Sequence, residues 1–354
     1  MSTMTTSQPS HAADRMPDFS NDLQLSVRDL EITLTTRDEA KPLVKGISFD
    51  IRRGETVCLV GESGCGKSVT SLAIMGLLQS PPLSVTGGQI LLREGDSVTD
   101  LAALTPRGSA YRDLRGRAMS MIFQEPMTSL NPAHRNGRQI VEMIRQHISL
   151  SRAAAWDRML EMLRLVGIPS PEIRAKQYPH QLSGGMRQRV MIALALACDP
   201  GLLLADEPTT ALDVTTQAQI LNEIRKLSVK RHTATLFITH DLGVVAQLAD
   251  HVHVMYHGKI VESGTVREIF KNPRHPYTRG LLASVPSLAR DQETDMETLD
   301  PIPGSVRDLP EDPSACPFQP RCRMALKRCA HETPPEFQVS ETHKARCWLE
   351  AEIR

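Results

Sequence analysis

Residues 61–68 read Gly-Glu-Ser-Gly-Cys-Gly-Lys-Ser, and this stretch decides the fold class. An apolar run at 56–60 predicts a strand before it, and the pattern over 69–78 predicts a helix after it. Glycines let the backbone amides of such a loop turn inward onto phosphate oxygens, and the helix adds its positive end. Strand, loop and helix together predict a phosphate-binding loop of the G-x-x-x-x-G-K-S type. The candidate nucleotide-binding residues of this region are Gly61, Glu62, Ser63, Gly64, Cys65, Gly66, Lys67, Ser68 and Val69.

Two side chains of this loop have predicted chemical roles. Lys67 is expected to reach the β- and γ-phosphates, and the Ser68 hydroxyl to complete the coordination shell of Mg²⁺. Cys65 is interpreted as a small residue that fills the turn. The loop alone therefore predicts a nucleotide with Mg²⁺, without saying what kind of protein uses it.

A second stretch, 201–208, reads Gly-Leu-Leu-Leu-Ala-Asp-Glu-Pro. Its apolar run is typical of a strand buried on both faces of a parallel sheet, which would deliver two carboxylates to the ligand-binding end. Successive side chains on a strand point in opposite directions, so the two acids can take different roles. We expect Asp206 to support Mg²⁺ and Glu207 to act as general base on the attacking water.

Two further polar residues end predicted strands. Gln124 follows an apolar run at 119–123, and we expect it to ligate Mg²⁺ or its water and to sense movement of the next segment. His240 follows the run at 235–239, where a sensor of the γ-phosphate would lie. Each signal is weak by itself. The loop at 211–213 is a candidate for carrying a signal between two such sites.

Residues 182–189 read Leu-Ser-Gly-Gly-Met-Arg-Gln-Arg and precede a predicted helix over 186–197. Ser183, Gly184 and Gly185 therefore form a helix N-terminus suited to an anion, with a hydroxyl added. One chain already has a phosphate cradle at 61–68. A second cradle is explained if it closes over the nucleotide of another subunit, which predicts a dimer with ATP at the interface.

The overall composition limits the classes of protein to which the chain can belong. The 354 residues carry 41 Lys and Arg against 41 Asp and Glu, so no basic footprint for nucleic acid is present. No apolar run approaches the 18 or so residues of a transmembrane helix. Residues 1–22 are polar and lack the apolar stretch of a signal peptide, so we interpret them as a disordered leader and place the chain in the cytoplasm.

The composition changes after the nucleotide-binding region. A polar stretch at 287–300 is a predicted linker, and four of the seven cysteines follow it. They are Cys316, Cys322, Cys329 and Cys347, and their density in a cytoplasmic chain predicts a thiolate metal site. Zinc ribbons prefer shorter C-x₂₋₄-C pairs, so a [4Fe–4S] cluster suits the spacing better, while zinc and unligated thiols stay open. Cationic neighbours that could offset the charge of a cluster are Arg321, Arg323, Lys327 and Arg328.

Taken together, these motifs resemble those of the ATP-binding-cassette (ABC) ATPases. The resemblance covers about residues 23–270 and implies an α/β fold, with a RecA-like P-loop ATPase core, an antiparallel β subdomain and a helical subdomain at about 127–188. It implies that ATP joins two cassettes head to tail and that hydrolysis releases them. In this family 61–68 is the Walker A loop, 202–207 Walker B, 182–186 the signature, 211–213 the D-loop, Gln124 the Q-loop residue and His240 the switch residue.

The C-terminal extension, 271–354, is similar to that of the ATPase subunits of bacterial oligopeptide, dipeptide and nickel importers. The similarity lies in His-Pro-Tyr-Thr at 275–278, Ile-Pro-Gly at 302–304 and Cys-Pro-Phe-Gln-Pro-Arg-Cys at 316–322. It implies a [4Fe–4S] cluster on the four cysteines. It also implies a homologous ATPase partner, two membrane permease subunits and an extracytoplasmic solute-binding protein, with the chain peripheral on the cytoplasmic face of the inner membrane.

Two alternatives belong to other classes. A non-transport ABC ATPase acting on DNA or ribosomes would usually carry tandem cassettes or long coiled-coil insertions, which this sequence lacks. A P-loop GTPase would carry an N-K-x-D guanine motif, and none is visible.

Overall fold

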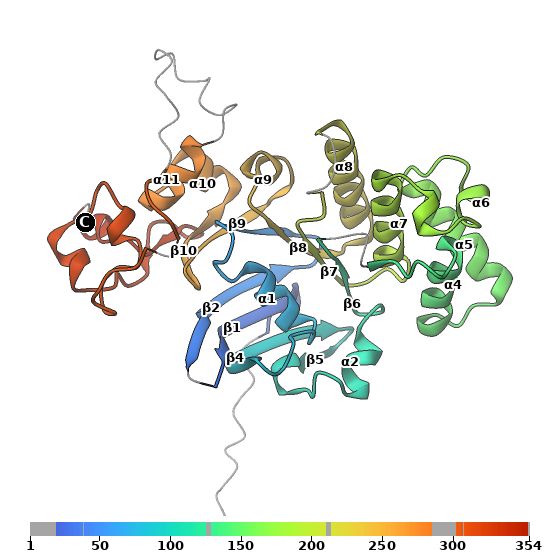
Figure 1. The fold of residues 1–354 in the computed structure, drawn as a ribbon, viewed down its shortest axis with the longest axis horizontal. Coiled ribbons are helices and arrows are strands. Elements are labelled where there is room, and N and C mark those ends of the chain that lie inside the picture. The colour runs from blue at the N-terminus through green and yellow to red at the C-terminus, as the bar shows by residue number, and fades with distance from the viewer. Residues whose placement is uncertain are drawn as a thin grey trace, which may run out of the picture.

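A computed structural model describes residues 19–37, 39–124, 129–209, 214–284, 302–306 and 308–352. Its centre is an eight-stranded sheet in the order β11-β12-β10-β9-β3-β8-β7-β6 (Figure 1). The strands are β3 (Thr56–Val60), β6 (Met119–Ile122), β7 (Leu202–Asp206), β8 (Ala234–Thr239), β9 (His251–Tyr256), β10 (Lys259–Thr265), β11 (Phe337–Gln338) and β12 (Lys344–Ala345). From β6 to β9 neighbouring strands are parallel, and from β9 to β11 they are antiparallel.

The parallel strands are buried on both faces, as their apolar runs predict. In β3, Val57 and Leu59 pack into one apolar core, whereas Cys58 and Val60 pack into the other. This division follows the two-residue period of a strand. It explains why the sequence of β3 is uniformly apolar instead of alternating.

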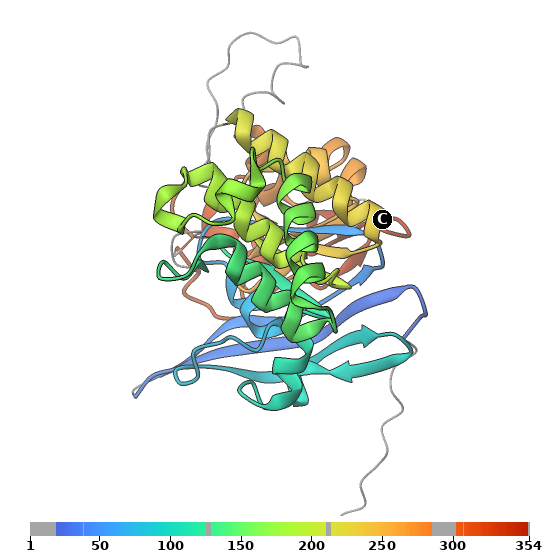
Figure 2. The same ribbon diagram turned by 90° about the vertical axis from the view of Figure 1, so that its right-hand side faces the viewer.

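A second, four-stranded antiparallel sheet lies on one side of the central sheet (Figures 1 and 2). Its order is β2-β1-β4-β5, formed by β1 (Leu23–Thr35), β2 (Ala40–Arg52), β4 (Leu83–Glu94) and β5 (Ser97–Asp100). Helix α1 (Lys67–Ile74) packs into the core between the two sheets through Ala73 and Ile74. The expected antiparallel β subdomain is therefore a separate layer.

Helices cover the opposite side of the central sheet (Figure 2). They include α8 (Val214–Arg231), α9 (Leu242–Leu248) and α10 (Val266–Lys271). Beyond the β6 edge lies the helical part, with α4 (Asn136–His147), α5 (Arg152–Leu165), α6 (Pro171–Arg174) and α7 (Gly184–Leu196). Over the described ranges, no helix has both the length and the apolar character needed to cross a bilayer.

The C-terminal extension is joined to the cassette through the central sheet. Strand β12 pairs with β10 of the cassette, and β11 pairs with β12. Helix α11 (Pro276–Ala283) connects the two regions, and α12 (Leu349–Glu352) lies near the end of the chain. The boundary that we expected near residue 270 is thus crossed by a continuous sheet.

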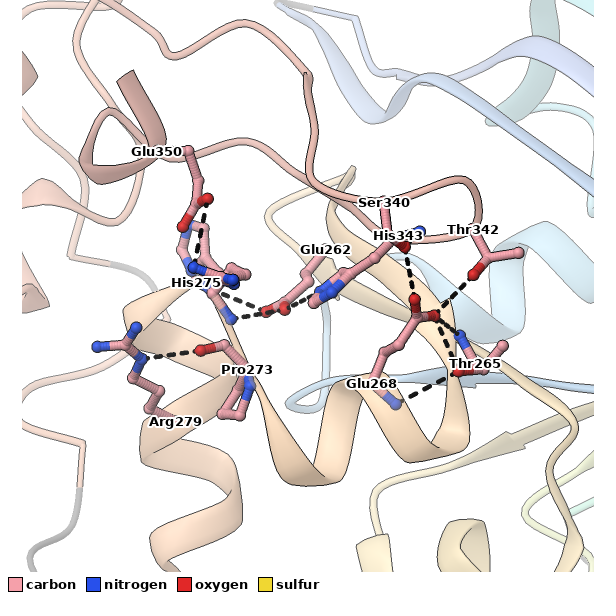
Figure 3. Close-up of polar contacts among 11 residues, drawn as sticks. Glu262, Thr265, Glu268, Pro273, His275, Arg279, Ser340, Thr342, His343 and Glu350 are labelled. Atoms are coloured by element: carbon pink, nitrogen blue, oxygen red, sulfur yellow. Dashed lines mark hydrogen bonds and ion pairs between the residues drawn. The ribbon is translucent and has the colours of Figure 1, made fainter. Parts of the chain in front are cut away.

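Buried polar contacts strengthen this junction (Figure 3). The fully buried carboxylate of Glu262 in β10 accepts hydrogen bonds from the backbone N–H groups of Arg274 (2.7 Å) and His275 (2.9 Å), and its Oε1 lies 2.7 Å from His343 Nε2. Burial raises the pKa of Glu262, but these hydrogen bonds outweigh it and the pKa lies below its usual value. The carboxylate is therefore held in its charged form between cassette and extension.

A second carboxylate holds the next turn of the extension. Glu268 accepts hydrogen bonds from the hydroxyls of Ser340 (2.6 Å) and Thr342 (2.9 Å) and from the backbone of Thr265, which caps α10 (Figure 3). Burial opposes ionisation, but these hydrogen bonds lower the pKa of Glu268 to about 2. The hairpin of β11 and β12 is thus fixed to α10 as well as to β10.

Candidate ATP site

The phosphate-binding loop lies between β3 and α1, as predicted. Gly61, Gly64 and Gly66 all have positive φ, and Gly66 precedes the first residue of α1. A Cβ on Gly61 would lie 2.2 Å from the carbonyl oxygen of Met255, so the backbone approach permits only glycine there. Residues Gly61 to Ser68 therefore lie between strand and helix with the glycine-dependent backbone that the sequence predicts. Val69 lies in the first turn of the helix.

The side chains of Lys67 and Ser68 make different contacts: Lys67 with the start of the loop and Ser68 with β7. Lys67 is 5% exposed, and its Nζ donates to the carbonyl oxygens of Gly61 (2.7 Å) and Glu62 (3.0 Å). The Ser68 hydroxyl donates to Asp206 Oδ1 at 3.0 Å. Burial raises the pKa of Asp206, and the hydrogen bond from Ser68 opposes that rise. Two of the three oxygen ligands expected for Mg²⁺ thus lie in direct contact.

The three residues expected to act at the γ-phosphate also come together. Glu207 Oε2 accepts a hydrogen bond from Gln124 Nε2 at 2.9 Å, and its Oε1 lies 3.0 Å from His240 Nδ1. Glu207 has a φ of 43°, in the left-handed region that costs a non-glycine residue about 1–3 kcal/mol. Its backbone N–H donates to Ile238 of the next strand, which helps to hold this conformation. The structure brings Gln124 to Glu207 and not to the Ser68–Asp206 pair, so its Mg²⁺ role stays a prediction.

The second anion-binding candidate lies on another helix. Ser183 caps the N-terminus of α7, where its hydroxyl accepts from the N–H of Met186, and Gly184 begins the helix. Ser183 and Gly184 are exposed and Gly185 is partly exposed. Figure 1 places α7 in the helical part and α1 at the centre of the molecule. The arrangement leaves the capped end available to a second chain. The D-loop candidate at 211–213 lies outside the described residues, as do the linker at 287–300 and most of the leader at 1–22.

Cys65 fills the turn, as interpreted from the sequence. Its side chain is 1% exposed and lies near Lys67, with Sγ 3.7 Å from Nζ. Burial raises the pKa of the thiol despite the nearby ammonium group. Cys65 therefore supports the loop from inside.

The four cysteines of the extension line one small cavity of ≈ 20 Å³. That volume is room for about one water molecule, much less than a cubane of four irons and four sulfides. No group of three or more His, Cys, Asp and Glu side chains among the described residues is arranged to hold a metal ion. Burial raises the pKa of Cys316 to about 11 and that of Cys347 to about 12, so both thiols are protonated while no metal is bound. The structure thus does not support the predicted [4Fe–4S] cluster.

One expectation for this region is wrong. Arg321 was expected to offset the charge of a cluster, but its guanidinium points toward the phosphate-binding loop and pairs with Glu62. Arg328 likewise pairs with Glu332 and lies over the ring of Trp348. No local pattern signals the Arg321–Glu62 contact, because the partners are separated by 259 positions.

Comparison with known proteins supports the interpretation of this region as an ATP site. The family described as "ABC transporter" matches residues 44–210, and that described as "Oligopeptide/dipeptide transporter, C-terminal region" matches 261–329. Among solved structures, a dimeric ATP-binding cassette, MJ0796, bound to ADP and Pi has a TM-score of 0.61 at 25% identity. It covers 69% of this chain and 99% of its own. The α/β cassette fold expected from the resemblance is confirmed.

Relatives in sequence extend the match over most of the chain. The oligopeptide transport ATP-binding protein OppD of Bacillus subtilis is 51% identical over 92% of this chain and 88% of its own. The dipeptide transport ATP-binding protein DppD of the same organism is 49% identical over 92% and 94%. The chain belongs to the ABC transporter ATP-binding proteins, and is an ABC-type ATPase. Within that family its similarity is to the oligopeptide and dipeptide transport members.

Proposed function

We propose that this chain is the ATP-hydrolysing subunit of a bacterial importer for dipeptides, oligopeptides or related solutes. The observation that carries the proposal is the joint presence of a cassette and a C-terminal region of the oligopeptide/dipeptide transporter type. The relatives named for peptide transport share about half of their residues with it along both regions. The alternative, a non-transport ABC ATPase acting on nucleic acid or ribosomes, finds no support in the balanced charge.

The residues of the site divide the work of hydrolysis. The phosphate-binding loop and Lys67 would bind and orient the β- and γ-phosphates, and Ser68 and Asp206, with Gln124, would hold Mg²⁺. The metal supplies charge neutralisation on the phosphate oxygens. Glu207 would accept a proton from the attacking water at a carboxylate oxygen, and His240 and Gln124 orient that carboxylate through the contacts at 3.0 and 2.9 Å.

The exposed cap of α7 is proposed to act on a second cassette. Ser183, Gly184 and Gly185 would bind the phosphates held by the partner, because an uncovered helix N-terminus, with a hydroxyl that can still donate a hydrogen bond, suits an anion. The partner is a homologous ATPase, either a paralogue or a second copy. Closure of two cassettes around ATP would then move the membrane subunits, and hydrolysis would reset them.

A groove beside the site suits the attachment of a membrane permease subunit. It has a volume of ≈ 330 Å³ and lies where the helical part meets the core, next to the segment that follows Gln124. Its lining is rich in methionine, which adapts to irregular apolar partners, and includes Met75, Met121, Met143 and Met191. We propose that a cytoplasmic helix of one permease docks in this groove, and that of the other permease in the corresponding groove of the partner ATPase. The chain would thus be peripheral on the inner membrane, indirectly served by a solute-binding protein outside.

Purification of the tagged chain from detergent-solubilised membranes tests this function. We expect two polytopic membrane proteins and a second ATPase to accompany the wild type. Met143→Glu, which places a charge in the groove, should lose the membrane proteins. The matched control is Ile173→Glu, because Ile173 is a 60% exposed apolar residue on α6 outside the groove. Recovery of ribosomes or DNA in place of membrane proteins would contradict the proposal.

The cysteine site is a separate proposal. We propose that Cys316, Cys322, Cys329 and Cys347 bind a [4Fe–4S] cluster, as the similarity of the C-terminal region to that of oligopeptide and dipeptide transporters implies. All four line one cavity, which would have to widen to hold the cluster. Protein purified without oxygen should contain iron and acid-labile sulfide in equal amounts, and Cys322→Ser should lose both. Cys198→Ser, at a cysteine elsewhere in the core, should keep them. Zinc in place of iron, or neither metal, would refute the cluster.

A further inference from the structure

Two residues of the C-terminal extension, Tyr277 and Arg321, contact Glu62 of the phosphate-binding loop. The backbone N–H of Glu62 donates to the hydroxyl of Tyr277 at 2.8 Å, and its carbonyl accepts from Lys67. Its carboxylate accepts two hydrogen bonds from Arg321, at 2.7 Å from Nη1 and 2.9 Å from Nη2. Every polar group of Glu62 is therefore engaged, two of the three by residues beyond the cassette core.

Arg321 is held rigidly from the other side. Its side chain is 2% exposed, against 29% for Glu62. Its Nε donates to the carbonyl oxygen of Pro303 at 2.8 Å, and its guanidinium lies 5.8 Å from the ring of Tyr256 and 6.0 Å from that of Phe318. Such a bidentate pair in a low-dielectric setting is strong and fixes direction as well as distance.

An aromatic cluster backs this pair. Tyr256 at the end of β9, Tyr277 in α11 and Phe318 in the extension pack with ring centroids 4.8 to 5.4 Å apart. All three rings are buried. Phe318 also lines the cysteine cavity, together with Cys322, the residue after Arg321 in the chain. The aromatic cluster thus packs between the phosphate-binding loop and the cysteine cavity and connects the two.

The charge of Glu62 would oppose anion binding if it stood alone. It is carried by the same loop whose amides are shaped for phosphate, and like charges repel at short range. Arg321 cancels that charge through its two hydrogen bonds to the carboxylate. The extension therefore contributes electrostatics as well as shape to the loop.

We propose that Arg321 is a positioning residue for the ATP site, through which docking of the C-terminal extension sets the affinity for ATP. The inference rests on the proposed use of residues 61–68 as the ATP site. When the extension is docked, the pair neutralises Glu62 and fixes the loop. When the extension moves, the loop loses its restraint and keeps an uncompensated carboxylate. The affinity for ATP is thereby linked to whether the cysteine-containing extension is docked on the cassette.

A charge-cancellation experiment tests this. ATP binding and steady-state hydrolysis are measured for the full chain carrying Arg321→Met, Glu62→Gln or both, with Lys327→Met as control because Lys327 is an exposed cation of the same extension. Arg321→Met should weaken ATP binding at least about fivefold. It should raise KM and leave kcat nearly unchanged, because the loop binds ground state and transition state alike. Adding Glu62→Gln should restore most of the affinity, whereas Lys327→Met should have no effect.

Unchanged affinity in Arg321→Met, or a double variant as weak as the single one, would overturn the proposal. The Lys67→Ala variant tests the ATP site itself, because it should lose ATP binding. Failure of the site assignment can therefore be distinguished from failure of the role given to Arg321. Because coupling is reciprocal, Mg·ATP should also slow amide exchange over residues 316–323 of the wild type. Exchange that ATP leaves unaltered there would equally overturn the link, and this measurement needs no variant to fold.

Discussion

A Glu207→Gln variant is expected to lose ATP hydrolysis by about 100-fold or more while keeping its affinity for ATP. The amide has the shape of the carboxylate but cannot accept a proton from water. Glu207 already makes the contacts that orient a base, with His240 and Gln124 on its two oxygens. The variant should therefore trap ATP and stall the transporter in its ATP-bound state. Phosphate release and retention of labelled ATP measure the two effects.

The control for this variant is Asp241→Asn. Asp241 is a nearby carboxylate that caps α9 through the N–H groups of Gly243 and Val244, a role that asparagine can also fill. Its turnover should remain close to that of the wild type. Wild-type turnover in Glu207→Gln itself would remove the assignment of the general base.

Replacement of Glu262 by alanine is expected to free the C-terminal extension from the cassette. The change leaves His343 and the backbone N–H groups of Arg274 and His275 without their buried acceptor. Removal of one partner of a buried, hydrogen-bonded pair costs about 3–5 kcal/mol. Amide exchange over residues 337–352 should accelerate more than about 100-fold, since each 1.4 kcal/mol is tenfold.

A matched change at the surface should do much less. Glu332→Ala removes an exposed pair with Arg328, for which about 0–1 kcal/mol is expected. Equal exchange rates in the two variants would contradict the role given to Glu262.

The junction should also weaken in acid. The pKa of Glu262 lies below its ordinary value of 4.5, so its contribution is complete above pH 4.5 and is lost as the pH falls through the lower, folded-state value.

The nucleotide-binding region was predictable because its signals are local. The strand at 56–60 was predicted at its observed bounds, because a short apolar run between Glu55 and Gly61 is typical of a buried strand. The helix after the loop was predicted to reach residue 78 but ends at Ile74. Gly76 explains the difference, because it has a φ of +60° and a Cβ there would collide with Tyr111. A glycine close after a helix is a common signal of its end, but the apolar pattern continues past Gly76 and led to a helix predicted too long.

The extension was less predictable because its contacts are distant in sequence. Cysteine spacing indicated that four thiols would gather, and they line one cavity, but spacing carries no information on the room between them. Arg321 was grouped with its sequence neighbours, whereas its contact is with Glu62 in the phosphate-binding loop. Neither partner has a local pattern that singles it out. Such a pairing is determined by how β10, α11 and the extension pack together.

Peptide uptake into proteoliposomes tests the central claim most directly. The complex purified with this chain would be reconstituted with its solute-binding protein, and uptake of a labelled oligopeptide measured with Mg·ATP on the side of the cassettes. We expect uptake that requires ATP, and that falls together with ATP hydrolysis in the Glu207→Gln complex. Uptake without ATP, or full ATP hydrolysis by a complex that moves none of the peptides tested, would contradict it.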